Sequence, residues 1–147
     1  MHFVSGGAYN GKANWVKEYY HIENLPKEKV EWISAYEREP LSEDISFGCK
    51  KLIVIEGLER WILQIAKTME IDEGKQYLQS LINRLLVFEQ SGDSQIVIIG
   101  TDISKGIVPV EQDLRKWRDL TGFLYQYIVD KSEKVHRIWF GIAQPLK

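Results

Sequence analysis

Short apolar runs alternate with longer segments of helical periodicity along this chain. Continuous apolar stretches at 2–4, 51–56 and 95–100 are typical of strands that are buried on both faces. Aromatic and β-branched residues at 30–35 and 135–142 predict two further strands. Apolar residues recur every three or four positions in four other segments, which predicts helices at 12–20, 58–69, 73–89 and 113–129. Strands that alternate with helices in this way predict an α/β fold with a mostly parallel central sheet.

Polar segments separate these predicted elements. Residues 36–46, which include several charges and Pro40, are expected to form a solvated loop with a short helix. Residues 91–94 end one helix, and 104–109 are expected to form another loop. In an α/β fold, ligands bind where such loops follow the carboxyl ends of the strands, so these ends are the first places to search for chemistry.

A glycine-rich turn lies between the first apolar run and the first predicted helix. Its members are Gly6, Gly7, Ala8, Tyr9, Asn10, Gly11, Lys12 and Ala13. They match the Gly, four residues, Gly-Lys of a phosphate-binding loop, in which backbone N–H groups and the lysine surround phosphate oxygens. Ala13 stands where the pattern has a Ser or Thr hydroxyl for Mg²⁺. The alternative is a strand-to-helix turn whose glycines serve only for tight packing.

Carboxylates follow two of the predicted strands. Glu56 ends the strand at 51–56, and Asp102 comes shortly after the strand at 95–100. Because the carboxyl ends of parallel strands meet at one edge, we expect both acids to lie there with the glycine-rich turn. An acid in this position often orients Mg²⁺, directly or through water. For Glu56 the alternative is a cap on the helix that follows Gly57.

Composition narrows the possible functions. The length of 147 residues fits one domain, residues 1–147, and the net charge of −2 gives no electrostatic footprint for nucleic acid or an anionic membrane. Cys49, the only cysteine, excludes an internal disulfide and is expected to pack in the interior. Because no apolar run is long enough to span a bilayer and no signal-peptide pattern is present, we expect a cytoplasmic protein.

Several segments match, in order, the motifs of one enzyme family. The glycine-rich turn resembles Gly-Gly-x-Arg-Ser-Gly-Lys-Ser, and 56–61 resembles an acid followed by Cys-Leu-Thr-x-Trp. Residues 101–109 resemble Asn-Glu-Val-Gly-x-Gly-Ile-Val-Pro, and 117–126 resemble Phe-Arg-Asp-x-x-Gly-x-x-Asn-Gln. The closing segment, with its apolar strand and Gly-Ile, is also similar. The chain thus resembles the adenosylcobinamide kinase/adenosylcobinamide-phosphate guanylyltransferase family of cobalamin biosynthesis.

This resemblance implies a fold, an activity and a set of site residues. The fold would be a three-layer P-loop NTPase-like domain, and the activity that of a transferase using ATP or GTP, Mg²⁺ and a corrinoid, assembled as a homotrimer. The glycine-rich turn would bind the nucleotide, Glu56 would orient the metal, and the catalytic residues would be Lys12, Asp102 and Arg118. For Arg118 the alternative is a salt bridge with acids of its own helix.

The chain departs from the family between the first helix and the central strand. Residues 21–49 are too few to hold the family's Arg-Ile-x-x-His type segment, whose histidine accepts the nucleotidyl group. Either 30–35 corresponds to the family's second strand, or 32–41 corresponds to its later Trp-x-Thr-x-Glu-x-Pro-Leu region. Both alignments delete that histidine, and His21 could replace it only if its connection folded back over the phosphates.

Three functions remain open. The first is an adenosylcobinamide kinase-like enzyme without guanylyltransferase activity. The second is a degenerate protein that binds a nucleotide or corrinoid as the partner of another enzyme, since Tyr9 replaces the family's arginine and Ala13 its serine. The third is a structural remnant in which the glycine-rich turn serves only for packing.

Overall fold

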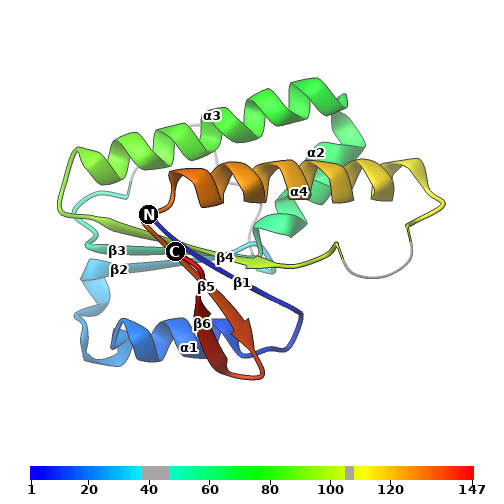
Figure 1. Ribbon diagram of the computed structural model, residues 1–147. Helices are drawn as coiled ribbons and strands as arrows, with labels where there is room; N and C mark the ends of the chain where they lie inside the picture. The colour runs from blue at the N-terminus through cyan, green and yellow to red at the C-terminus, as the bar shows by residue number, and fades with distance from the viewer. Residues whose placement is uncertain (38–46, 105–107) are drawn as a thin grey trace.

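The structure is a computed structural model, described here for residues 1–37, 47–104 and 108–147. In these residues a six-stranded sheet has the order β2-β3-β4-β1-β5-β6, and all neighbours are parallel except β5 and β6 (Figure 1). The strands are β1 (His2–Gly6), β2 (Val30–Ser34), β3 (Leu52–Glu56), β4 (Gln95–Thr101), β5 (Lys134–Trp139) and β6 (Ile142–Pro145). The helices are α1 (Lys12–Tyr19), α2 (Leu58–Thr68), α3 (Ile71–Gln90) and α4 (Gln112–Lys131), with short 3-10 turns η1 (Ile22–Asn24) and η2 (Lys27–Lys29).

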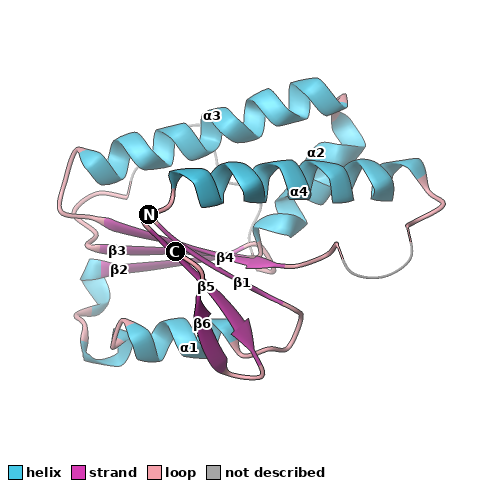
Figure 2. Cartoon of the chain, viewed as in Figure 1, coloured by secondary structure: helices cyan, strands magenta, loops and turns pink. Residues whose placement is uncertain are grey.

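Helices cover both faces of the sheet. Figure 2 shows α1 on one face and α2, α3 and α4 on the other. Side chains of a strand alternate between faces, so β3 sends Ile53 and Ile55 toward the three helices and Val54 toward α1. Each face therefore has its own core, and the predicted three-layer P-loop NTPase-like architecture is confirmed.

The register of β1 places the glycine-rich turn in the middle of the sheet. β1 pairs with β4 on one side and with β5 on the other, and Gly6 is the partner of both Thr101 and Ile138. The loop that follows Gly6 therefore emerges at the carboxyl edge, between the ends of two neighbouring strands. Ligands bind at this edge in open parallel sheets.

The predicted helices and the strand at 30–35 are confirmed, with small differences at their ends. Two predictions are wrong. The segment 135–142 is not one strand: β5 and β6 form an antiparallel hairpin whose turn is Phe140 and Gly141. Cys49 is exposed and not packed in the interior. The loops expected at 36–46 and 104–109 lie largely outside the described residues.

A membrane-spanning element was not expected, and none of the helices in the described ranges has the length and apolar character needed to cross a bilayer.

A buried histidine attaches α1 to the sheet. His2 is fully buried, and its ring nitrogens hydrogen-bond with the Tyr20 hydroxyl at 2.7 Å and with Nδ1 of His136 at 2.9 Å. The rings of Trp15 and Tyr19 contact it at 6.0 and 5.5 Å between centroids. Burial, assisted by His136, lowers the pKa of His2 to about 4, so this imidazole is neutral in the folded protein near pH 7.

Stability is therefore expected to fall on mild acidification. The unfolded state takes up a proton on His2 below about pH 6.5, which the folded state resists until about pH 4. Between these values the free energy of unfolding should fall by at most about 1.4 kcal/mol per pH unit from this group. Urea denaturation at pH 7 and pH 5 measures the effect. In His2→Leu the free energy of unfolding should depend less on pH between these values. A pH dependence as steep as that of the wild type would contradict the role of His2.

Candidate active site at the glycine-rich loop

The loop between β1 and α1 requires glycine at two positions. A Cβ on Gly6 would lie 2.3 Å from the carbonyl oxygen of Ile138 in the neighbouring strand, so no side chain fits there. Gly11 has a φ of 82° and forms the N-cap of α1, a left-handed conformation that glycine adopts without strain. The loop thus follows β1 closely and turns sharply into α1, as a phosphate-binding loop must.

Lys12 is folded back onto this loop. Its Nζ donates a hydrogen bond to the Gly7 carbonyl at 2.8 Å, and the Asn10 N–H approaches the same oxygen at 3.4 Å. Burial lowers the pKa of Lys12, whereas the carboxylates of Glu59 and Glu56 act in the opposite direction. The ammonium group therefore lies near two acids. Its present hydrogen-bond acceptor is the Gly7 carbonyl, and a phosphate oxygen could take the place of that acceptor.

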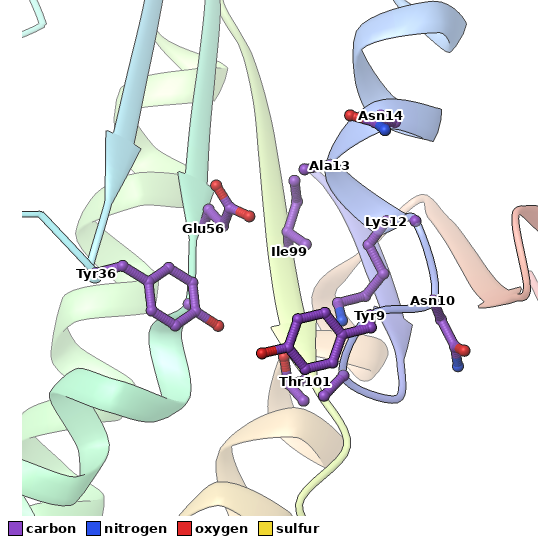
Figure 3. A pocket seen from close by; sticks show the side chains of 12 residues that line it. Tyr9, Asn10, Lys12, Ala13, Asn14, Tyr36, Glu56, Ile99 and Thr101 are labelled. Atoms are coloured by element: carbon purple, nitrogen blue, oxygen red, sulfur yellow. The ribbon is translucent and has the colours of Figure 1, made fainter.

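A cavity of about 470 Å³ opens beside the loop. The loop and the start of α1, residues 8–14, form one wall. Figure 3 shows Tyr36 and Glu56 on the opposite side, with Ile99 and Thr101 of β4 between the two. The structure therefore brings together the predicted loop and Glu56.

Glu56 is fixed by a neighbouring strand. The indole Nε1 of Trp32 in β2 donates a hydrogen bond to Glu56 Oε2 at 3.0 Å. The N-cap of α2 is Gly57, and no side chain caps this helix. Glu56 therefore does not act as the hydrogen-bonding cap that the sequence left open.

The side chains around this cavity could bind Mg²⁺ only together with the phosphates of a nucleotide. In the described residues no group of three His, Cys, Asp or Glu side chains could hold a metal. Ala13 contributes no oxygen, which leaves Glu56 as the only carboxylate that lines the cavity in this part of the chain. One carboxylate is sufficient for Mg²⁺ that is bound mainly by substrate phosphates and water.

The other two predicted catalytic residues lie elsewhere. Asp102 lines a second cavity, of about 280 Å³, between β1 and α4, and its Oδ1 accepts hydrogen bonds from the N–H and Oγ of Ser104 at 3.0 and 2.5 Å. Arg118 on α4 donates to the Ser104 carbonyl. Neither residue lines the cavity beside the glycine-rich loop.

A buried acid, Glu59, was not predicted from the sequence. Its Oε1 accepts a hydrogen bond from the Tyr36 hydroxyl at 3.0 Å, and its Oε2 accepts from the Thr101 N–H and the Tyr125 hydroxyl, both at 3.1 Å. Burial and this carboxylate raise the pKa of Tyr125 well above its usual value. Glu59 thus connects α2, α4 and β4 and positions Tyr36 at the cavity.

A sequence signal for Glu59 did exist. It is an acid three and seven positions before Ile62 and Ala66, on the apolar stripe that packs α2 into the core. A charged residue on such a stripe needs buried partners, which tyrosine hydroxyls supply here.

Comparison with known proteins identifies the family of this chain. A family model described as cobinamide kinase / cobinamide phosphate guanyltransferase matches residues 26–146. The chain belongs to this family. No curated protein matches it. Membership in this family implies cobalamin biosynthesis with a nucleotide and a corrinoid as small-molecule substrates.

The match begins after the glycine-rich loop and α1. It covers β2 to β6, including Glu56 and the closing hairpin. The assignment of residues 6–13 to phosphate binding therefore depends on the geometry of the loop and on its place beside Glu56.

Proposed function

We propose that this protein is an adenosylcobinamide kinase-like transferase. It moves the terminal phosphoryl group of ATP or GTP to the hydroxyl of the corrinoid's aminopropanol arm. The observation that carries the proposal is that Lys12 and Glu56 line the same cavity from opposite sides, with the backbone of a glycine-rich loop beside them. Family membership supplies the substrate class.

Positioning and charge stabilisation account for most of phosphoryl transfer. The N–H groups of the loop and the N-terminus of α1 favour phosphate oxygens there. Lys12 exchanges the Gly7 carbonyl for a phosphate oxygen and stabilises the charge that develops on transfer. Mg²⁺ bound with the nucleotide would neutralise phosphate charge, and Glu56 would hold one of its waters.

Asp102 and Arg118 keep the roles that the family resemblance implies. Asp102 would orient the metal or the substrate hydroxyl, and Arg118 would add a phosphate contact. Each now contacts Ser104 and would have to exchange that contact for one with the substrate. The resemblance also supports a homotrimer.

Loss of the guanylyltransferase reaction is part of the proposal. Between α1 and β2 the chain forms only η1 and η2, so no helix there carries a histidine toward the loop. His21 is exposed and does not line the cavity. His2 and His136 hydrogen-bond with each other on the α1 face of the sheet.

One observation favours a second candidate, a nucleotide-binding partner protein without turnover. Ala13 lines the cavity at the position of the magnesium-binding hydroxyl, and Tyr9, at the family's arginine, is fully exposed to solvent. The chain thus lacks a metal ligand and a phosphate-binding cation at once.

Two measurements on the wild-type protein separate these candidates. Isothermal titration with ATP and GTP, with and without Mg²⁺, tests binding, and a direct assay with adenosylcobinamide tests transfer. The kinase proposal expects Mg²⁺-dependent formation of the corrinoid phosphate. Binding without turnover would favour the partner protein, and no binding of either nucleotide would contradict both.

A further inference from the structure

An exposed aromatic side chain lies at the turn of the closing hairpin. Phe140 is 75% exposed, and its φ of 48° is in the left-handed region that a bulky residue rarely adopts. Gly141, the second residue of the turn, has a φ of 78°. The hairpin therefore combines backbone strain with apolar exposure at a single residue, a pairing that often marks a functional site.

This turn is attached directly to the glycine-rich loop. The Gly141 N–H donates a hydrogen bond to the Asn10 carbonyl at 2.9 Å, and a Cβ on Gly11 would lie 3.5 Å from the Gly141 Cα. Figure 1 shows the β5–β6 hairpin (orange to red) beside the start of α1. The position of Phe140 is therefore fixed relative to the loop.

The neighbouring side chains leave a face of the Phe140 ring accessible. The edge-to-face partner of Phe140 is Trp139, at 5.4 Å between centroids and an interplanar angle of 87°. The guanidinium of Arg137 lies 5.4 Å from the centre of the Trp139 ring. Neither contact covers Phe140, as its exposure shows. Aromatic rings held in this way form stacking platforms for planar bases.

We propose that Phe140 is the platform on which the base of the nucleotide stacks while its phosphates lie in the glycine-rich loop. This inference rests on the proposed nucleotide binding. A nucleoside triphosphate has phosphates at one end and a flat ring at the other, which suits a loop in backbone contact with an exposed aromatic turn. Glu56 faces the loop across the cavity, so the terminal phosphate points toward it and the base lies at Phe140, outside the cavity.

The variant Phe140→Asn tests the platform without disturbing the hairpin, because Asn-Gly is a preferred sequence for a turn in which both residues have positive φ. Phe140→Trp retains an aromatic face, and Leu146→Ala removes an exposed apolar side chain elsewhere. The dissociation constants of ATP, GTP and inorganic tripolyphosphate are measured by titration calorimetry. Phe140→Asn should weaken nucleotide binding about tenfold and leave tripolyphosphate binding unchanged. Phe140→Trp and Leu146→Ala should match the wild type.

Unchanged nucleotide binding in Phe140→Asn, or equal weakening of nucleotide and tripolyphosphate, would overturn the platform while leaving the role of the loop intact. A wild-type protein that binds neither ligand would remove the proposed function as well. A change of oligomeric state in Phe140→Asn, measured by light scattering, would assign this face to an interface between copies and overturn the inference.

Discussion

Replacing Lys12 with alanine is expected to lower Mg²⁺-dependent phosphoryl transfer roughly 100-fold or more. Lys12 is the one cationic side chain among the described residues that line the cavity, so no neighbour can replace its charge. Its only hydrogen bond in the described residues goes to the Gly7 carbonyl, which can turn to water when the side chain is removed. Initial rates with saturating adenosylcobinamide and either nucleotide measure the effect.

Two controls accompany this variant. Lys67→Ala removes an exposed lysine from the last turn of α2 and should keep the wild-type rate. Thermal unfolding of Lys12→Ala should match that of the wild type, which shows that the loss is chemical. Transfer by Lys12→Ala within twofold of the wild type would contradict the assignment of the loop as the phosphate site.

Removal of the buried carboxylate at Glu59 is expected to have the largest effect on stability. In Glu59→Ala the Thr101 N–H loses its acceptor, and the hydroxyls of Tyr36 and Tyr125 lose their hydrogen bonds to a carboxylate that is only 4% exposed. The Tyr125 hydroxyl keeps only the Thr101 carbonyl, at 3.3 Å. Each buried donor without a partner costs about 1–3 kcal/mol, so the free energy of unfolding should fall by about 3 kcal/mol. Urea denaturation measures this loss.

Two comparison variants show whether the hydrogen bonds are responsible. Tyr125→Phe removes one donor and leaves the carboxylate with two, so it should cost only about 1 kcal/mol. Glu70→Ala removes an acid that is 89% exposed and should change stability little. A Glu59→Ala protein as stable as Glu70→Ala would disprove the role of Glu59.

Most of the sheet could be predicted because burial on both faces leaves a clear pattern. The central strands β3 and β4 are continuous apolar runs, and such runs are typical of strands that are covered on both faces. The glycine-rich loop and Glu56 could be predicted from their order after strands, since parallel strands end at one edge. The assignment of these residues to binding and catalysis stays a prediction.

The parts that were missed leave no periodic pattern in the sequence. The hairpin of β5 and β6 turns at Phe140 and Gly141, and an aromatic residue with positive φ is not a turn signal. The apolar stripe of α2 could have marked Glu59 as buried, but its role could not be assigned because its partners come from positions 36, 101 and 125. Asp102 follows a strand as expected, but its side chain bonds to Ser104, a local contact that strand order does not reveal.

The central position of β1 also determines when the candidate site can form during synthesis. β1 is made first, but its two neighbours are β4 and β5, which lie far along the chain. A ribosome releases the N-terminus long before these strands exist, and non-local pairing of this kind is slow. β1 therefore gains β4 before the last helix is made but lacks β5 until that helix has left the ribosome, so a truncated chain that ends before β5 would leave one edge of β1 unpaired.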